Sequence, residues 1–333
     1  MRAIWLLPLL VILQFSLPFS RTAEHPAPEP VVTHLVLGGD VMLSRHVARV
    51  AREKRDPAFP LRDLAPVLQA ADIAFVNLES PFSDRGAVVE HGMIFKAEPE
   101  MVAALELAGV DVVSTANNHA RDQGSHGLEF TLDWLERHQI AVAGTGSSAE
   151  AAHAGVVIER NGIKFGFLGY TYDQSNGNHT DTDDRVAVMD VTRMREDVGK
   201  LAARADAIIV SMHAGVEYSP KSNTQQVAFA RAAIDAGASV VVGHHPHVTQ
   251  PWEWYGQGVI FYSLGNLVFD QFQRVETQHG ALADIVFEGP RLAKASLLPV
   301  EIVGTAPRLA VAKRLPATDP ASSAGPSAGP AAK

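Results

Sequence analysis

Short apolar runs that alternate with helical patterns are the feature of this sequence that most limits its fold. The runs are rich in Val, Ile and Ala and are expected to form strands at residues 34–40, 72–79, 110–118, 140–144, 206–213 and 239–245. Apolar residues at helical spacing fill segments between them, at 60–71, 99–109, 125–139 and 225–237. Because strands this uniformly apolar are buried on both faces, the alternation predicts an α/β fold around a largely parallel sheet.

Two other segments have the pattern of β-hairpins. Residues 156–170 place Asn161 and Gly162 between two apolar runs, and this dipeptide favours a tight hairpin turn. Residues 253–266 form a similar pair of runs around Tyr255–Gly258. These hairpins predict a second, antiparallel sheet that packs with the first.

The composition of the ends differs from that of the centre. Residues 1–20 hold one arginine followed by a mostly apolar run, which predicts a signal peptide or an N-terminal membrane anchor and therefore an exported, periplasmic or otherwise extracytoplasmic protein. Residues 21–32 are a proline-rich linker, and residues 316–333 are a low-complexity tail expected to be disordered. The folded domain is expected to span residues 33–315.

The overall composition excludes several functions. The chain has 333 residues, a net charge of −9 and no long basic run, so binding to nucleic acid through phosphate neutralisation is not expected. It has no cysteine, which excludes disulfides, thiolate metal sites and a cysteine nucleophile. Hydrophobic residues make up 47% and charged residues 20%, as in ordinary globular proteins.

Polar side chains follow the predicted strands where the strands end. Ligands of α/β sheets bind beyond the carboxyl ends of the strands, so these residues are expected to converge on one site. They are Asp40, Asn77, Glu79, Asn117, Asn118, His119, His213, His244, His245 and His247.

Carboxylate, amide and imidazole groups without thiolate suit a divalent metal such as Mn, Zn or Fe. The side chains expected to hold one or two ions are Asp40, Glu79, Asn118, His213, His245 and His247. Two close ions would lower the pKa of a bridging water and assist hydrolysis of a phosphoester. His119, beside a proposed ligand, is expected to be catalytic by donating a proton or stabilising the developing charge.

Each of these residues also has a simpler interpretation. A single Asp, Asn or His at a strand end is more often a turn or capping residue than a ligand. The cluster His244, His245 and His247 is harder to explain in this way, because three imidazoles at a buried strand exit are costly unless something binds them. The histidines that do not follow a predicted strand lack this placement, and they are His25, His34, His46, His91, His126, His138, His153, His179 and His279.

Several longer motifs occur in order along the chain. They are GGDVMLSR (38–45), NLESP (77–81), FKAEPE (95–100), STANNHARDQG (114–124), LGYT (168–171), MHAGVEY (212–218), GHHPHVTQ (243–250) and FYSLGNLVFDQ (261–271). Together these motifs resemble the CapA family of poly-γ-glutamate capsule synthesis proteins, and the resemblance runs from about His34 to Gln271.

The resemblance implies a fold related to the calcineurin-like metallophosphoesterases, an α/β two-sheet sandwich flanked by helices. It matches the superfamily's metal ligands to Asp40, Asn118, His213, His245 and His247, and the Asn-His pair places His119 beside Asn118.

The match also shows three departures from the superfamily pattern. Glu79 stands for a bridging aspartate and is one methylene longer. His244 stands where a glycine is expected, and Met42 stands two residues after Asp40 where a histidine is expected.

Further residues of the matching motifs are candidates for contacts other than metal ligation. Arg45 and Lys96 could bind an anionic polymer or a phosphate. The residues expected to orient the ligands are His244, Glu217, Asn266 and Asp270. Ordinary surface or turn chemistry is the alternative for these positions.

The sequence leaves two functions open. One is a metal-dependent hydrolase, acting on a phosphoester or on a bond in poly-γ-glutamate. The other is a non-catalytic, membrane-anchored accessory subunit that binds or guides the anionic polymer for a membrane synthase complex. A purely structural metal is a third, weaker possibility.

Overall fold

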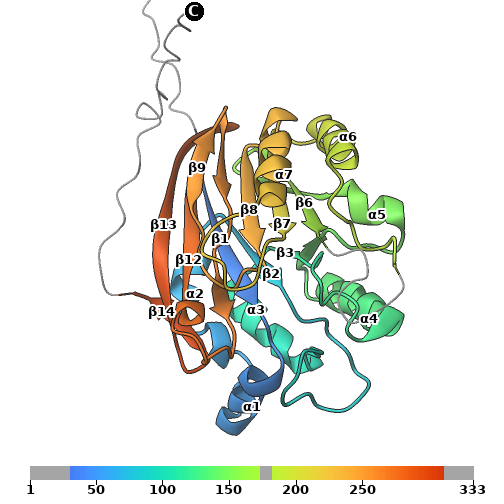
Figure 1. The fold of residues 1–333 in the computed structure, drawn as a ribbon, viewed down its shortest axis with the longest axis vertical. Helices are drawn as coiled ribbons and strands as arrows, with labels where there is room; N and C mark the ends of the chain where they lie inside the picture. Colours follow the sequence, from blue (N-terminus) through green and yellow to red (C-terminus); the bar gives the residue numbers. More distant parts are fainter. Residues whose placement is uncertain (1–30, 173–181, 311–333) are drawn as a thin grey trace, which may run out of the picture. The chain divides into compact units, whose positions relative to one another are not determined.

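In the part of the chain that the structure describes, two β-sheets pack face to face and helices cover the outer side of each (Figure 1). The computed structural model describes residues 31–172 and 182–310. The predicted α/β sandwich flanked by helices is therefore confirmed. The predicted signal or anchor at 1–20 and the predicted tail at 316–333 lie outside the described residues.

The larger sheet has the strand order β14-β13-β12-β1-β2-β3-β4, with β11 also paired to β1. The strands β1 to β4 are parallel to one another, and β12, β13 and β14 add antiparallel pairs on the far side of β1. The bounds are β1 (Val32–Val41), β2 (Ile73–Leu78), β3 (Val112–Ser114), β4 (Ala141–Ala143), β11 (Asn266–Val268), β12 (His279–Glu288), β13 (Arg291–Val303) and β14 (Ala306–Leu309).

The smaller sheet has the order β5-β6-β7-β8-β10-β9. Its inner strands β6, β7, β8 and β10 are parallel, and β5 and β9 pair antiparallel at its two edges. The bounds are β5 (Val156–Arg160), β6 (Ile163–Thr171), β7 (Ala207–His213), β8 (Val240–His244), β9 (Trp252–Tyr255) and β10 (Gly258–Phe261).

The division of strands between the sheets corrects the prediction. Every predicted apolar run contains a strand, but β7 and β8 belong to the smaller sheet and not to one parallel sheet with β1 to β4. The two hairpins, β5–β6 and β9–β10, are confirmed, yet they border the smaller sheet and form no separate antiparallel one. A continuous apolar run indicates burial on both faces, and it carries no information about which strand lies beside it.

Helices fill the outer layers. On the larger sheet lie α1 (Arg45–Lys54), α2 (Ala65–Gln69), α3 (Val102–Ala108) and α4 (Gly124–Arg137); on the smaller sheet lie α5 (Ala149–Ala154), α6 (Val191–Ala202) and α7 (Thr224–Asp235) (Figure 1). Short 3₁₀ turns complete the set: η1 (Phe59–Leu61), η2 (Pro99–Met101) and η3 (Glu276–Gln278). The four predicted helical segments are present, the first two with a 3₁₀ turn before the helix. None of the helices within the described ranges has the length and apolar character needed to cross a membrane.

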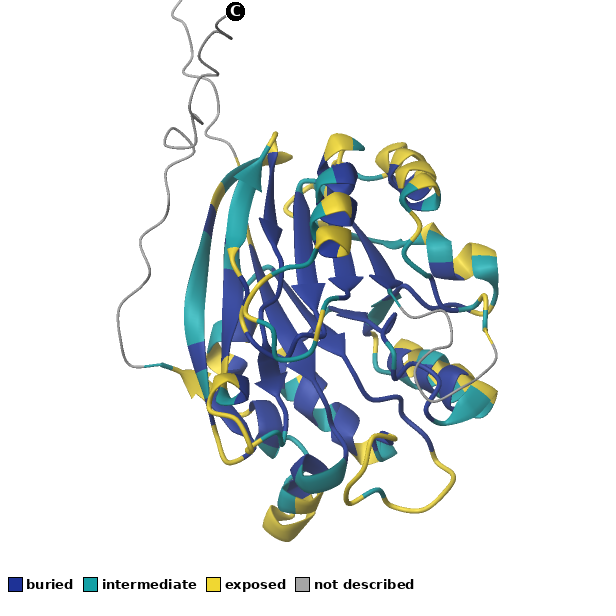
Figure 2. Ribbon diagram, in the orientation of Figure 1, coloured by how far each residue is buried: buried dark blue, intermediate teal, exposed yellow. Residues whose placement is uncertain are grey.

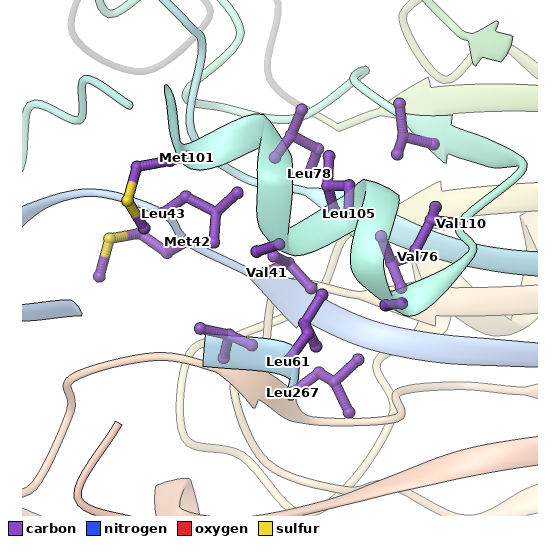
Figure 3. Close-up of a cluster of buried hydrophobic side chains, with 14 of the residues drawn as sticks. Val41, Met42, Leu43, Leu61, Val76, Leu78, Met101, Leu105, Val110 and Leu267 are labelled. Atoms are coloured by element: carbon purple, nitrogen blue, oxygen red, sulfur yellow. The ribbon is translucent and has the colours of Figure 1, made fainter. Parts of the chain in front are cut away.

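The core consists of apolar layers separated by the sheets. Side chains alternate along β1, so that Leu35 and Leu37 face the layer between the sheets while Val36 faces the helices of the larger sheet. Figure 3 shows part of the helix-side layer, where Leu105 of α3 lies near Val76 of β2. The central strands of both sheets are therefore buried on two faces, and exposed residues lie on the outer sides of the helices and in loops such as 84–94 (Figure 2).

The end of β1 lies unusually close to the segment that enters β11. A Cβ atom on Gly39 would stand 1.9 Å from the carbonyl oxygen of Gly265, a distance that excludes any side chain. The amide of Asp40 donates to the same oxygen at 3.0 Å. Gly39 therefore allows the contact that fixes the backbone position of Asp40.

Replacing Gly39 by alanine is expected to destabilise the protein. The added methyl group meets backbone and not a flexible side chain, so we expect the free energy of unfolding to fall by about 1–3 kcal/mol or more. Urea denaturation followed by circular dichroism measures this. Gly199→Ala is the matched control, because Gly199 lies in α6 with no atom near its would-be Cβ; it should be neutral or stabilising by about 0.5–1 kcal/mol. Equal stability of the two variants would contradict the expectation.

Candidate metal centre

The ends of strands from both sheets meet at one buried place. Asp40 lies near the end of β1 and Glu79 directly follows β2, both in the larger sheet. His213 ends β7 and His244 ends β8, both in the smaller sheet. The strand ends therefore converge as predicted. They come from two sheets, however, and each sheet contributes part of the cluster.

A compact group of three side chains forms the centre of the cluster. Ligand atoms of Asp40, Glu79 and His247 all lie within 4.8 Å of one another, and all three residues are buried. His247 lies between the carboxylates, with Nδ1 at 3.4 Å from Asp40 Oδ2 and Nε2 at 3.6 Å from Glu79 Oε1. His247 also belongs to a second group of possible metal ligands, together with His245 and Glu217.

The remaining predicted ligands lie against this group. Asn118 Oδ1 is 2.8 Å from His213 Nε2, and the rings of His213 and His245 are 4.9 Å apart. Asn77 links the two sides, because its side-chain amide donates to Asp40 Oδ1 at 2.8 Å and lies 3.3 Å from His213 Nδ1. The structure therefore brings all six predicted ligands into one neighbourhood. Sequence reasoning noticed Asn77 at a strand exit but did not include it among the site residues.

Burial and neighbouring groups shift the pKa values in opposite directions. Burial raises the pKa of Glu79 well above its ordinary value, and the carboxylates of Asp40 and Glu217 add to this. Burial also opposes ionisation of Asp40, but hydrogen bonding to His244 and His247 holds its pKa well below the ordinary value. Burial and His245 lower the pKa of His213, which keeps this imidazole neutral.

This arrangement fits a divalent cation. Among the described residues, the buried Oε1 of Glu79 has no hydrogen-bond partner, although it faces the imidazole of His247. A buried carboxylate oxygen without a hydrogen-bond partner is costly, and a cation held between Asp40, Glu79 and His247 would remove that cost. A neutral imidazole such as His213 is the form that coordinates metal. The donor set of carboxylate, amide and imidazole is also that of Mn, Zn or Fe sites.

The loop that carries the late histidines has a strained backbone. His245 and His247 have φ values of 94° and 59°, a region that residues other than glycine rarely adopt. Two contacts hold the loop in place: the His245 amide donates to Asp40 Oδ2 at 3.2 Å, and the Tyr218 amide donates to the carbonyl of Pro246 at 2.8 Å. Strain of this kind costs about 1–3 kcal/mol per residue and clusters at functional sites.

His119 lies at the edge of the cluster with a carboxylate behind it. Its Nδ1 is 2.7 Å from Asp122 Oδ2, its Nε2 is 3.9 Å from Glu79 Oε1, and its ring stacks on Phe95 at 3.9 Å. Asp122 thus fixes the ring and leaves Nε2 facing the cluster. Sequence reasoning missed Asp122, although a carboxylate three residues after a proposed catalytic histidine was an available signal.

Of the residues expected to orient the ligands, three lie at the cluster. His244 Nδ1 is 3.5 Å from Asp40 Oδ1, Asn266 Oδ1 is 2.9 Å from His247 Nδ1, and Glu217 belongs to the second ligand group. Asp270 instead forms an ion pair with Arg45 and accepts the backbone N–H of His46.

Arg45, which the sequence predicts to bind substrate, lies near the cluster, but its guanidinium already has an ion-pair partner and a hydrogen-bond partner. Besides Asp270, its guanidinium donates to the carbonyl of Gly92 at 2.6 Å and lies 4.6 Å from the Phe95 ring centre. Phe95 is the ring that stacks on His119. Arg45 and the predicted catalytic His119 therefore both contact the ring of Phe95.

Lys96 is placed differently. Its ammonium is buried and lies 3.0 Å from Glu98 Oε1, 3.0 Å from the carbonyl oxygen of Gly86 and 3.3 Å from that of Arg85. These three oxygens match the three N–H groups of a lysine ammonium. Binding of substrate by Lys96 stays a prediction that would require one of these contacts to break.

Comparison with known proteins identifies the family. The profile of the bacterial capsule synthesis protein PGA_cap family matches residues 34–271. The chain belongs to this family. Among similar proteins, the capsule biosynthesis protein CapA of Bacillus anthracis is 29% identical over 319 residues, covering 91% of this chain and 76% of the relative. The PGA biosynthesis protein CapA of Bacillus subtilis (strain 168) is 30% identical over 305 residues, covering 89% and 79%. The resemblance seen in the motifs is therefore confirmed.

A solved structure shares the fold of this PGA_cap protein. It is described as a novel phosphatase from Mycoplasma pneumoniae and superposes with a TM-score of 0.53 at 14% sequence identity, covering 82% of this chain and 94% of that chain. At this identity the likeness concerns the fold. It confirms the α/β two-sheet sandwich flanked by helices that the family resemblance implied.

Purified protein is expected to bind a divalent transition metal through the cluster. Removing the central imidazole with His247→Ala should weaken Mn or Zn binding by about 10–100-fold or more, since even the loss of a supporting residue has that effect. Elemental analysis after dialysis against each metal measures the bound ions. His126→Ala is the control, because His126 pairs with Asp84 at the exposed surface. Metal content that is the same in both variants would contradict a site at His247.

Proposed function

We propose that this protein is an exported, envelope-associated component of poly-γ-glutamate capsule formation whose metal centre hydrolyses a phosphoester or a bond in the polymer. The observation that carries the proposal is the buried group of Asp40, Glu79 and His247 at the junction of the two sheets. Membership of the PGA_cap family supports the link to capsule formation. The apolar segment at 1–20 supports export.

The residues of the cluster would have different roles in the proposed hydrolysis. A divalent ion, when bound, would polarise the oxygen of the scissile group and lower the pKa of a water molecule. Asp40, Glu79 and His247 would hold it, with Asn118, His213 and His245 as further donors. His119 faces the cluster through Nε2 and is the candidate proton donor for the leaving group, while Asp122 holds the other ring nitrogen.

The charge of the protein limits how an anionic polymer can approach. With a net charge of −9, the chain as a whole repels poly-γ-glutamate, so attraction has to come from the metal centre or from local cations. Arg45 lies beside the rings of Phe95 and Phe269 at the edge of the site, but its charge is already paired with that of Asp270.

A second candidate function is that of a non-catalytic accessory subunit for a membrane synthase complex. One departure from the superfamily pattern favours this second function. The residue two positions after Asp40 is Met42, and its side chain is fully buried in the apolar layer. That position supplies no metal ligand, so the site has one donor fewer than the superfamily pattern. In this role the domain would bind or guide the polymer without cleaving it.

An activity screen separates the two functions. If the protein is a hydrolase, adding Mn or Zn should produce turnover of a phosphodiester or a γ-glutamyl peptide, and His245→Ala should abolish it. In cells, an accessory role predicts polymer production that survives His119→Ala but is lost when residues 1–20 are removed. Absence of turnover with either metal, together with that cellular result, would reject the hydrolase.

Asp122 provides a more specific test of the proposed mechanism. Asp122→Asn keeps the shape of the side chain but removes the negative charge that would stabilise the His119 ring while it carries the proton to be donated. We expect kcat to fall by about 10²–10⁴-fold, the usual contribution of general acid–base catalysis, with little change in KM. Metal content should stay at the wild-type level. Unchanged kcat would show that His119 does not transfer a proton in the rate-limiting step.

A further inference from the structure

A cavity of about 370 Å³ lies beside the metal centre and has no role in the chemistry described above. Its size is at the lower end of the range for small-molecule sites. Its lining includes Tyr218, Val248, Thr249, Arg274, Glu276 and His279. Val248 directly follows His247, and the ring centre of Tyr218 is 6.3 Å from that of His247. A ligand in this cavity would therefore lie next to the proposed metal ligands.

Arg274 gives the cavity a cation that is free to bind. Its guanidinium carbon lies 4.7 Å from the centre of the Tyr218 ring, and the residue is exposed. Among the described residues, no carboxylate forms an ion pair with it. Stacking on an aromatic ring orients the planar guanidinium and leaves its edge available, which is the geometry for bidentate binding of a carboxylate. Arg45, by contrast, is already paired with Asp270.

The segment that carries Arg274 is fastened to the metal centre. Thr277 Oγ1 lies 2.6 Å from the carbonyl oxygen of Gln271 and 2.9 Å from that of Arg274, which closes the loop on itself. Asn266 donates from its side chain to the carbonyl of Thr277 at 3.0 Å, while its Oδ1 contacts His247 Nδ1 at 2.9 Å. One amide side chain thus joins the loop to a proposed ligand, and this fixes the loop relative to the cluster.

The backbone around Tyr218, which also lines the cavity, is held in place by hydrogen bonds as well. Tyr218 has a φ of 62° and is held by its amide, which donates to the carbonyl of Pro246. Gln250 donates from its side chain to the carbonyls of Ser219 at 2.9 Å and Lys221 at 3.0 Å. A wall built in this way loses little conformational entropy when a ligand binds.

We propose that this cavity is a subsite for a γ-linked chain of glutamate residues, in which Arg274 binds one carboxylate and places the neighbouring bond at the metal centre. Each residue of such a chain carries one free carboxylate, which the guanidinium of Arg274 would bind, and one amide N–H. Glu276 and Thr249 offer oxygen acceptors for that N–H. The inference rests on the proposed role in poly-γ-glutamate formation and names the segment of substrate that the site recognises.

Calorimetric titration of the full chain tests the subsite without relying on turnover. The probe is a synthetic γ-linked tetraglutamate, and its counterpart with every free carboxylate converted to an amide is the neutral control. Chelator-treated protein is used, and thermal unfolding confirms that each variant is folded. We expect Arg274→Ala to weaken binding of the acidic oligomer by about tenfold or more, because a charge-assisted bidentate contact is lost. Arg274→Lys should recover only part of the affinity, since lysine is a point charge.

Arg308→Ala is the matched control, because Arg308 is an exposed arginine on β14 that pairs with Glu301. It should bind both oligomers like the wild-type protein. The subsite is rejected if Arg274→Ala binds the acidic oligomer as tightly as wild type, if the amide oligomer binds equally well, or if wild type binds neither. Binding that depends on Arg274 in a protein without turnover would reject the hydrolase proposal and keep the subsite.

Discussion

Burial of two carboxylates, Asp40 and Glu79, where the sheets meet is the constraint on which the rest of this structure depends. A buried carboxylate needs donors or a cation, and here those groups come from distant parts of the chain: Asn77 from β2 and His247 from the loop after β8. The strands must therefore end within a few ångströms of one another. The glycine at position 39 serves this requirement, since it lets the end of β1 touch the segment entering β11.

The strands could be predicted from the sequence, whereas their neighbours could not. The runs that became β1, β2, β7 and β8 are apolar on both faces, and local pattern is enough to detect them. Membership of one sheet or the other is decided by contacts between residues far apart in sequence, such as the pairing of β1 with β12. The spacing of residues along the chain does not reveal such contacts. The sequence-based prediction therefore placed β7 and β8 in the wrong sheet.

The candidate site shows the same division. Residues that end strands were predicted as a group, because parallel strands bring their carboxyl ends together. Two residues that reach the site from loops were missed: Asp122 arrives through a turn after His119, and Arg274 through a loop closed by Thr277. The position of such a loop residue depends on hydrogen bonds made after the strands have packed, and the spacing of residues along the chain does not reveal those hydrogen bonds.

The division of ligands between the sheets has a consequence for the stability of the whole domain. An ion bound by Asp40 and Glu79 on one side, and on the other by His213 at the end of β7 and the histidines of the loop after β8, would act as a reversible cross-link between the halves of the sandwich. Its contribution would grow with the free ion concentration as RT ln(1 + [L]/Kd), because the unfolded chain has no such arrangement of donors. The chain has no cysteine, so no disulfide could link the two sheets in this way.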